Sequence, residues 1–285
     1  MSLKITVLGC GSSGGVPRIG NQWGQCDPNN PRNRRLRCSL LVERQGPAGK
    51  TGAEGKTRVL IDTSPDLRAQ LLNAGVSWLD GVLFTHDHAD HTHGIDDLRV
   101  VAFNGRRHVD AYMSRDTAEV LTKRFGYCFE TFEGSPYPPI LNLRDMQAGR
   151  PVTVNGEGGA IAALPFDQAH GHTRTLGFRF GDIAYSCDVS DIPDASLAAL
   201  EGLDVWIVDA LRRTPHPSHF ALADTLRWIE RVKPKRAFLT NMHIDMDYDT
   251  LIRELPEGVA PAHDGLVVET PAALPESLAA GPAGP

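Results

Sequence analysis

The chain has 285 residues and a formal net charge of −6, with 41% hydrophobic and 22% charged residues. Such a composition is ordinary for a globular protein that buries a large core. No run approaches the ~20 apolar residues that cross a bilayer, so no membrane partner is expected. The negative charge argues against a general nucleic-acid binder and favours a small substrate, although a local basic patch is compatible with it.

Five cysteines are spread along the chain without a Cys-x-x-Cys pair, and their number is odd. This pattern is typical of a reducing cytoplasm and not of a disulfide framework. The first residues also lack the apolar core of a secretory signal. We therefore expect a cytoplasmic protein.

Residues 4–8 alternate toward a first strand, which runs into glycines at positions 9, 11, 14 and 15. A glycine-rich loop lets the backbone approach a ligand closely because no Cβ intervenes. A tight turn at the end of the strand would explain the same glycines. The irregular segment 18–37 follows, with arginines that either grip phosphate or form a solvated surface: Arg32, Arg34, Arg35 and Arg37.

Residues 38–42 and 58–62 predict two paired strands, and the segment 45–57, rich in Gly, Lys and Ala, predicts an exposed hairpin loop between them. Asp62 ends the second of these strands. From the residues it fits the cap of a helix that starts near Pro65. The family resemblance given below offers a second role, in which Asp62 orients a metal-binding histidine.

The stretch 85–93 holds four of the chain's eleven histidines, with two aspartates interleaved among them. It follows a short apolar run that predicts a buried strand. Side chains two residues apart project to the same side of an extended backbone, so His86 and His88 can chelate one cation. Asp90 and His91 can hold a second cation beside it. Imidazole suits zinc, iron or manganese, and the carboxylate shifts the preference toward harder ions.

Apolar residues at helical spacing after Gly94 predict a helix, and a strand at 109–113 and a helix at 116–125 follow. This alternation is typical of an α/β fold. The segment 126–160, rich in aromatic residues and proline, predicts a cover for a core edge without a catalytic role. The second half predicts strands at 160–164, 176–180, 183–186, 203–210 and 236–240, and a helix from about residue 218.

The motif His86-Asp87-His88-Ala89-Asp90-His91 is the hallmark of the metallo-β-lactamase superfamily, which the chain resembles. The opening Leu8-Gly9-Cys10-Gly11-Ser12-Ser13-Gly14-Gly15-Val16-Pro17 resembles that of its PhnP-like and ribonuclease Z-like phosphodiesterase branch. The resemblance runs from about residue 3 to residue 270. It implies an α/β fold of αββα type, a four-layer sandwich that forms a single domain over residues 1–270. Residues 271–285, dominated by Pro, Ala and Gly, predict a disordered tail.

The resemblance implies two divalent metal ions, zinc or manganese. It assigns the first ion to His86, His88 and His170, and the second to Asp90, His91 and a last histidine, with Asp188 bridging both. His172 is the alternative to His170, which we favour because the family's ligand is commonly followed by glycine. The family usually has its last histidine directly after a Leu-Thr pair, where this chain has Asn241. We expect His243, two residues on, to take that role.

The resemblance also implies a proton donor for the leaving oxygen. His219 matches that place, at the expected start of a helix whose dipole supports an anion, and His216 is the alternative. Asp90 is the other catalytic residue. Three arginines are candidates for phosphate binding: Arg35, Arg212 and Arg213.

The function implied is hydrolysis of a cyclic phosphate or small nucleotide phosphodiester by a hydroxide held between the two ions. The alternatives are a ribonuclease Z-like enzyme acting on RNA, a lactone or thioester hydrolase of the same fold, and a binding module without turnover. A homodimer is compatible with the sequence. PhnP-like relatives bind a structural zinc with a cysteine cluster in the loop 18–37, where this chain has only Cys26, so we expect that zinc site to be absent.

Overall fold

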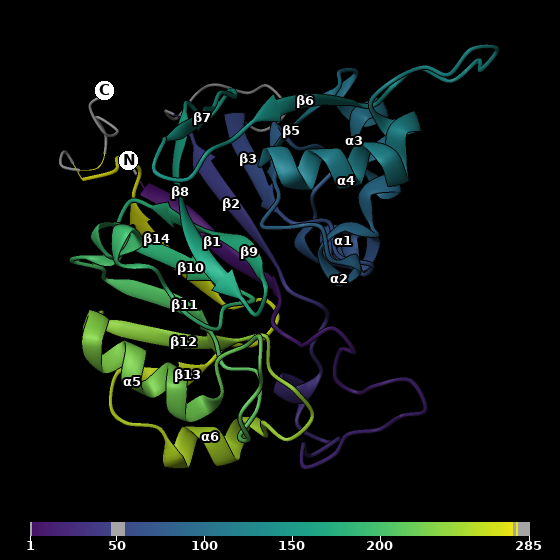
Figure 1. Cartoon of the computed structure of the whole chain (residues 1–285). Helices are drawn as coiled ribbons and strands as arrows, with labels where there is room; N and C mark the ends of the chain where they lie inside the picture. The colour runs from purple at the N-terminus through teal and green to yellow at the C-terminus, as the bar shows by residue number, and fades with distance from the viewer. Residues whose placement is uncertain (1, 47–54, 276–277, 279–285) are drawn as a thin grey trace.

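The computed structural model describes residues 2–46, 55–275 and 278 (Figure 1). In these residues the chain forms two seven-stranded sheets packed face to face, with helices on the outer faces (Figure 1). This architecture confirms the predicted αββα sandwich. None of the helices in the described part of the chain could span a lipid bilayer.

The first sheet contains the chain's first strand and its last one, which lie side by side. Its strand order is β14-β1-β2-β3-β4-β5-β6. The strands are β1 (Ser2–Gly9), β2 (Ser39–Gln45), β3 (Lys56–Ile61), β4 (Gly81–Leu83), β5 (Val109–Met113), β6 (Leu141–Asp145) and β14 (Val267–Pro271). The helices on its outer side are α1 (Leu67–Ala74), α2 (Ala89–Thr92), α3 (Leu98–Gly105) and α4 (Arg115–Phe125) (Figure 1).

The second sheet is built from the second half of the chain, in the order β13-β12-β11-β10-β9-β8-β7. The strands are β7 (Val152–Val154), β8 (Ile161–His170), β9 (Thr173–Phe180), β10 (Ile183–Ser186), β11 (Val205–Asp209), β12 (Arg236–Thr240) and β13 (Val259–Pro261). Its outer helices are α5 (Leu222–Val232) and α6 (Tyr248–Glu254) (Figure 1).

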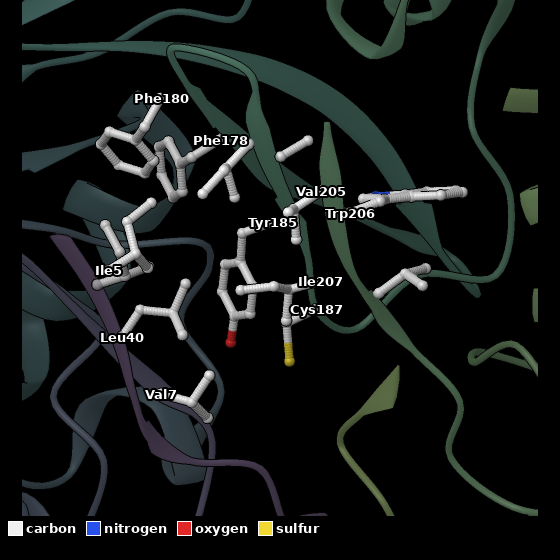
Figure 2. Packing of buried hydrophobic residues seen from close by; sticks show 14 of the residues in the cluster. Ile5, Val7, Leu40, Phe178, Phe180, Tyr185, Cys187, Val205, Trp206 and Ile207 are labelled. Carbon is white, nitrogen blue, oxygen red and sulfur yellow. The ribbon is translucent and has the colours of Figure 1, made fainter. Parts of the chain in front are cut away.

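The main core lies between the two sheets. Figure 2 shows Ile5, Val7 and Leu40 of the first sheet across from Phe178 and Tyr185 of the second, and all five are at most 1% exposed. Alternation along β1 places every second side chain in this layer. A smaller apolar cluster fills the space between the first sheet and its helices. The site therefore rests on a rigid, doubly packed base.

Several elements differ from the sequence prediction. The strand expected at 160–164 extends through His170, and the helix expected near residue 218 begins at Leu222. Phe220 lies in extended chain before it, because its backbone N–H donates to the carbonyl of Val189 at 2.6 Å. His219 is therefore not at a helix N-terminus. Short strands β6, β7, β13 and β14 and helix α6 were not predicted.

The two segments expected to be loose fall partly outside the described residues. In the predicted hairpin loop 45–57, residues 47–54 lie outside them. In the predicted tail 271–285, residues 276–277 and 279–285 lie outside them as well. Within the described part of that tail, Pro271 ends β14 and Leu274 is 8% exposed.

Candidate metal centre

Five parallel strands and β8, which ends at His170, deliver polar residues to the site. β3 and β4 are parallel neighbours in the first sheet, and β10, β11 and β12 are parallel neighbours in the second. The carboxyl ends of parallel strands meet at one edge of a sheet, which is where ligands commonly bind. The residues that end or follow these strands are Asp62, His86, Asp188, Asp209 and Asn241.

Three of these residues have a left-handed backbone: Asp62 at φ 62°, Asp188 at φ 51° and Asn241 at φ 60°. Asp and Asn tolerate this region better than most residues, since their short polar side chains bond locally. Backbone held there costs free energy and is found mainly where the surrounding structure enforces it, often at functional sites. The conformation turns each chain sharply at the strand end, so the side chains converge.

Close approach of the backbone explains two of the glycines around the site. A Cβ on Gly9 would lie 2.1 Å from the carbonyl oxygen of Arg37, and one on Gly171, at φ 61°, would lie 2.9 Å from the Cβ of Ser218. Gly171 follows the predicted ligand His170 at the turn between β8 and β9. The glycines thus allow the loops that carry the site to touch one another.

The first group of potential ligands is the one predicted for the first ion. His86, His88, His170 and Asp188 each offer a ligand atom, and these four atoms lie within 4.8 Å of one another. The Nε2 atoms of His86 and His170 are both 3.6 Å from Oδ2 of Asp188. His172, the alternative to His170, is exposed. The structure therefore favours His170.

The second group surrounds the other oxygen of the same carboxylate. The Nε2 atom of His91 is 3.3 Å from Oδ1 of Asp188 and 3.5 Å from Oδ2 of Asp90. Asp90 and His91 lie in the short helix α2, whose turn brings them to this side. Asp188 thus faces the first group with one oxygen and the second group with the other, as a bridging carboxylate does.

Hydrogen bonds from behind orient three of the histidines. Nδ1 of His91 donates to Oδ2 of Asp62 at 2.7 Å. The Thr85 hydroxyl donates to the same carboxylate at 2.8 Å and accepts from Nδ1 of His86 at 2.9 Å. Nδ1 of His170 donates to a backbone carbonyl at 2.6 Å. Each of these rings therefore turns its Nε2 toward Asp188.

Asp62 had two predicted roles, and the structure favours one of them. Its side chain is completely buried and bonds to His91 and Thr85. The residue at the N-cap of α1 is Asp66 instead. Asp62 is therefore an orienting residue for the ligand histidines.

Burial and neighbouring charges shift the pKa values of three groups in the site. Burial disfavours the imidazolium of His86 and lowers its pKa well below the usual range. Burial acts in the same sense on His91, but Asp188, Asp90 and Asp62 outweigh it and raise the pKa of that ring. Burial opposes ionisation of Asp188, yet His91 holds its pKa well below the ordinary value. Of these groups, His91 is the one whose surroundings favour a positive charge beside the carboxylates.

The donor set fits a pair of divalent cations. The Nε2 atoms of His86 and His91 are buried and have no hydrogen-bond partner among the described residues. A buried polar atom without a partner costs free energy unless a ligand satisfies it. Imidazole nitrogens and carboxylate oxygens within 4.8 Å of one another are the ligands that zinc and manganese use.

A cavity of about 370 Å³ opens onto these groups. His88, Asp90, His170 and Asp188 line it. The other lining residues come from the glycine loop and from the segments that follow β11 and β12: Ser12, Ser13, Arg18, Leu211, Arg212, His216, Ser218, His219, Asn241 and His243.

His219 is paired with a carboxylate that sequence reasoning did not assign. Its Nδ1 donates to Oδ2 of Asp209 at 2.8 Å, and Asp209 is completely buried at the end of β11. Burial raises the pKa of Asp209 to about 6. Burial lowers the pKa of His219, but the hydrogen bond and charge of Asp209 outweigh it, and the net shift is upward. His219 therefore holds a proton more readily than an isolated histidine.

Two of the predicted phosphate-binding arginines lie elsewhere. Arg35 is 1% exposed, and its guanidinium donates to the backbone carbonyl of Met246 at 2.7 Å. Arg213 pairs with Glu254 at 2.7 Å and does not line the cavity. The prediction for Arg35 was wrong. Its buried side chain faces neither solvent nor a ligand, and it anchors the loop 18–37 to the segment just before α6. Arg212 lines the cavity as expected.

His243 does not join the second group of ligands. It lines the cavity, but its Nδ1 bonds to Oδ1 of Asp245 at 2.9 Å, and it belongs to none of the ligand groups found in the described residues. Asn241 lies closer, with its amide nitrogen 2.9 Å from Oδ1 of Asp188. The expectation that His243 completes the second group is therefore not supported by the geometry.

Sequence reasoning missed Asp209, Arg18 and Ser12. Asp209 ends a run of buried strand residues. That position could have identified it, because a carboxylate is buried only when it has a partner. Arg18 and Ser12 lie in or next to the glycine loop. The hydroxyl of Ser12 is buried without a partner among the described residues and lines the cavity.

Comparison with known proteins agrees with this geometry. A family model for the beta-lactamase superfamily domain matches residues 57–244. The crystal structure of a diphosphatase from the PhnP family is 36% identical with a TM-score of 0.80, over 94% of this chain and 97% of that one. Human short-form tRNase Z has a TM-score of 0.59 at 14% identity, over 94% and 99% of the two chains, which shows the shared fold.

A curated relative is longer than this chain. An octanoyltransferase from Porphyromonas gingivalis is 31% identical over 93% of this chain, but the match spans only 51% of that protein. The likeness therefore concerns about half of the relative. The family model covers residues 57–244, which include the motif from His86 to His91 and Asp188, and the PhnP-family structure covers 94% of the chain. The chain belongs to the metallo-β-lactamase superfamily of hydrolases, in its PhnP-like branch.

Proposed function

We propose that this hydrolase cleaves a small phosphodiester and that His219 protonates the leaving oxygen. The observation that carries the proposal is the His219–Asp209 pair, 2.8 Å apart, which opens onto the cavity beside the ligand groups. A thioester would need less help for its leaving group, because a thiolate is a weaker base than an alkoxide. A phosphodiester with an alkoxide leaving group gains most from a placed acid.

The charge of the cavity suits an anionic substrate. Arg18 and Arg212 line it together with the ligand groups. Nε and Nη2 of Arg212 donate to the carbonyls of Thr214 and Pro215 at 3.1 and 2.7 Å, which fixes the side chain in one place. A guanidinium held in this way binds phosphate oxygens with little further loss of entropy. The volume of about 370 Å³ is at the small end of ligand sites and fits a small diester.

Two divalent ions, zinc or manganese, are the expected cofactors. His86, His88, His170 and Asp188 would hold one ion, and Asp90, His91 and Asp188 the other. When bound, such ions activate a water molecule as nucleophile and neutralise charge that develops on phosphate oxygens. Asp90 is a metal ligand and, by its position on the cavity wall, a candidate to orient the attacking water.

His219 is prepared for acid catalysis by its own contacts. Its Nδ1–H is committed to Asp209, so the proton available to substrate is the one on Nε2. Asp209 also accepts from the backbone N–H of Val189 at 3.1 Å, and this second bond keeps the carboxylate in place. The raised pKa of His219 keeps the ring protonated nearer to neutral pH. His216 lacks a carboxylate partner of this kind among the described residues.

The nature of the diester has two candidates. A cyclic phosphate or small nucleotide follows from the sequence resemblance. A diphosphate linkage follows from the PhnP-family relative, which is a diphosphatase. Both place one phosphate between two ester or anhydride oxygens and use the same groups of the site. RNA is less favoured, because the net charge is −6.

Hydrolysis of an acyl thioester is the second candidate function. The octanoyltransferase relative supports it, since the superfamily fold also suits thioesters, but the match covers only half of that protein. A lipid-like acyl chain would need an apolar wall beside the metal centre. The wall here is mostly polar, with Leu211 as its one large apolar side chain among the described residues.

A substrate panel separates these functions. The purified protein, loaded with Zn²⁺ or Mn²⁺, is assayed on bis-4-nitrophenyl phosphate, a 2′,3′-cyclic nucleotide, a dinucleoside diphosphate, a short RNA, a lactone and an octanoyl thioester. We expect turnover of at least one of the three small phosphate substrates and its loss in His88→Ala. Turnover confined to the thioester or lactone, or no turnover of any phosphate substrate with either metal, contradicts the proposal.

A further inference from the structure

The two halves of the metal centre have different donors. Oδ2 of Asp188 faces two imidazole nitrogens at 3.6 Å, those of His86 and His170. Oδ1 of Asp188 faces one imidazole nitrogen, that of His91 at 3.3 Å, and the amide of Asn241 at 2.9 Å. One half of the centre is therefore rich in nitrogen, and the other contains a carboxamide.

The backbone around Asn241 places this amide firmly. Asn241 follows β12 directly, is 2% exposed and has φ 60°. The preceding Thr240 accepts a hydrogen bond from the backbone of Ala210 at 3.0 Å, and the following Met242 donates to the carbonyl of Cys10 at 2.9 Å. Both sheets thus hold the short turn that carries the side chain, so the amide has little freedom except rotation about its last bond.

Rotation of that amide exchanges a donor for an acceptor. Without a cation, the amide nitrogen faces the Asp188 carboxylate because N–H can donate to it, and the amide oxygen lies 3.9 Å from the thiol of Cys38. A cation beside Oδ1 of Asp188 reverses this preference, since it attracts the oxygen end of the amide dipole. The NH₂ group would then face the sulfur of Cys38, which accepts weak hydrogen bonds.

We propose that the amide oxygen of Asn241, and not His243, is the last protein ligand of the second ion. Asp90, His91 and Asp188 supply its other ligands. This proposal depends on the metal pair of the proposed function but not on its phosphodiester substrate. His243 is hydrogen-bonded to Asp245 and lines the cavity, where it can contact the substrate instead.

The two halves of the centre therefore favour different metal ions. The first half offers three imidazoles and one carboxylate oxygen, a set that suits Zn²⁺. The second half offers one imidazole and three oxygens, a set that suits Mn²⁺ or Mg²⁺. A mixed pair, with Zn²⁺ in the nitrogen-rich half and Mn²⁺ in the oxygen-rich half, is the expected loaded state.

One competing donor lies close by. The thiol of Cys187 is 3.2 Å from Oδ1 of Asp188, and its side chain extends into the space between the sheets beside Tyr185 (Figure 2). A thiolate there would make the second half a soft site that prefers Zn²⁺. It would also give a sulfur-to-metal charge-transfer band with Co²⁺, which an amide ligand does not.

The test is metal binding to the untagged full-length protein after removal of metals by a chelator. One equivalent of Zn²⁺ is added, and Mn²⁺ is then titrated by calorimetry and by the loss of the free Mn²⁺ EPR signal. The variants are Asn241→Gly, Asn241→His, His243→Ala and Cys187→Ser. Glycine suits φ 60° and removes the Asn241 side chain without straining the backbone, so this variant is expected to fold, and the thermal melting midpoint of each variant checks it.

We expect the wild-type protein to bind one Zn²⁺ and one Mn²⁺. Asn241→Gly should weaken Mn²⁺ binding by about 10–100-fold while leaving the first equivalent of Zn²⁺ unchanged. Asn241→His should increase the affinity for a second Zn²⁺ by about tenfold or more. His243→Ala and Cys187→Ser should keep both ions.

Several results would overturn the proposal: wild-type Mn²⁺ affinity in Asn241→Gly, loss of Mn²⁺ in His243→Ala, or a Co²⁺ charge-transfer band that disappears in Cys187→Ser. Failure of the protein to bind any second ion would overturn it as well. None of these results depends on which substrate is hydrolysed. Absence of phosphodiester turnover with normal binding of both ions would contradict the proposed function alone.

Discussion

His219→Ala should reveal the acid role through its dependence on the leaving group. The pair of His219 with Asp209, 2.8 Å apart, places one protonated ring at the cavity beside Asp188. A positioned general acid contributes about 10²–10⁴-fold, or roughly 3–5 kcal/mol of barrier. A 4-nitrophenolate leaving group needs no proton, so its kcat should fall less than about tenfold. A simple alkoxide leaving group should show nearly the whole loss.

The assay is kcat and kcat/KM for a series of phosphodiesters that share one ester group and differ only in the basicity of the leaving alcohol. The wild-type rate should depend weakly on that basicity, and the His219→Ala rate strongly. Asp209→Asn keeps the size of the partner but removes its charge, and should give an intermediate slope. His216→Ala, from the same loop, should affect all members of the series alike.

Metal content and the thermal midpoint have to match the wild-type values, because His170 lies next to His219 with ring centroids 4.5 Å apart. An equal loss for good and poor leaving groups in His219→Ala, with both ions retained, would refute the acid role. The histidine would then act in binding or in holding the cavity wall.

Three further predictions concern other parts of the chain. Arg35→Met should lower the free energy of unfolding in urea by about 3 kcal/mol or more, since it removes two buried charge-assisted hydrogen bonds, and should leave KM unchanged; a raised KM in a protein of normal stability would restore the phosphate role. Burial raises the pKa of Asp264 to about 7, so the folded state holds this proton more tightly than the unfolded state and stability falls as pH rises from about 4 to 7. The unfolding free energy of the wild type relative to Asp264→Asn should therefore decrease by up to about 4 kcal/mol over that range, and a pH-independent difference would contradict it. Arg212→Ala should raise KM about 10–100-fold and Arg213→Ala should not, as measured on the best phosphate substrate; equal effects would remove the distinction between them.

The sequence was most informative where a short stretch determines both spacing and position. In the motif from His86 to His91, the strand before it and the turn of α2 are local, so period and propensity sufficed to predict which side chains meet. The resemblance also predicted that His170 and Asp188 lie beside this motif, and the structure brings a potential ligand atom of each within 4.8 Å of those of His86 and His88. The layers of the fold followed from the same resemblance and from the strand and helix alternation.

The prediction for His243 was made from a rule that did not apply. Side chains two residues apart share a face only while the backbone stays extended. The strand ends at Thr240, and Asn241 adopts φ 60°. The alternation of side chains therefore ends before Asn241 and cannot place His243. His243 consequently bonds to Asp245 on the cavity wall, and the amide of Asn241 reaches the carboxylate.

The partners of Arg35 and Asp209 could not be predicted from the sequence, because each contact forms only when the folded chain brings separate segments together. Arg35 looks like its neighbours in the arginine run, and only the approach of Met246 from the other end of the chain buries it. Asp209 has its partner ten residues on, across a loop whose path is determined by backbone pairing of Phe220 with Val189. Such contacts depend on the assembled sheets and leave no periodic signal.

The pairing of β1 with β14 has a consequence for attached domains. Ser2 lies opposite Pro271, so the two ends of the folded chain are neighbours at the same border of the first sheet. The cavity lies beyond the other end of β1, roughly 25 Å away for eight residues at ~3.4 Å each. A domain fused at either end would therefore lie away from the mouth of the cavity and leave it open. If such a domain had its own active site, a compound passing between the two sites would diffuse through bulk water, unless the linker brought the two domains together.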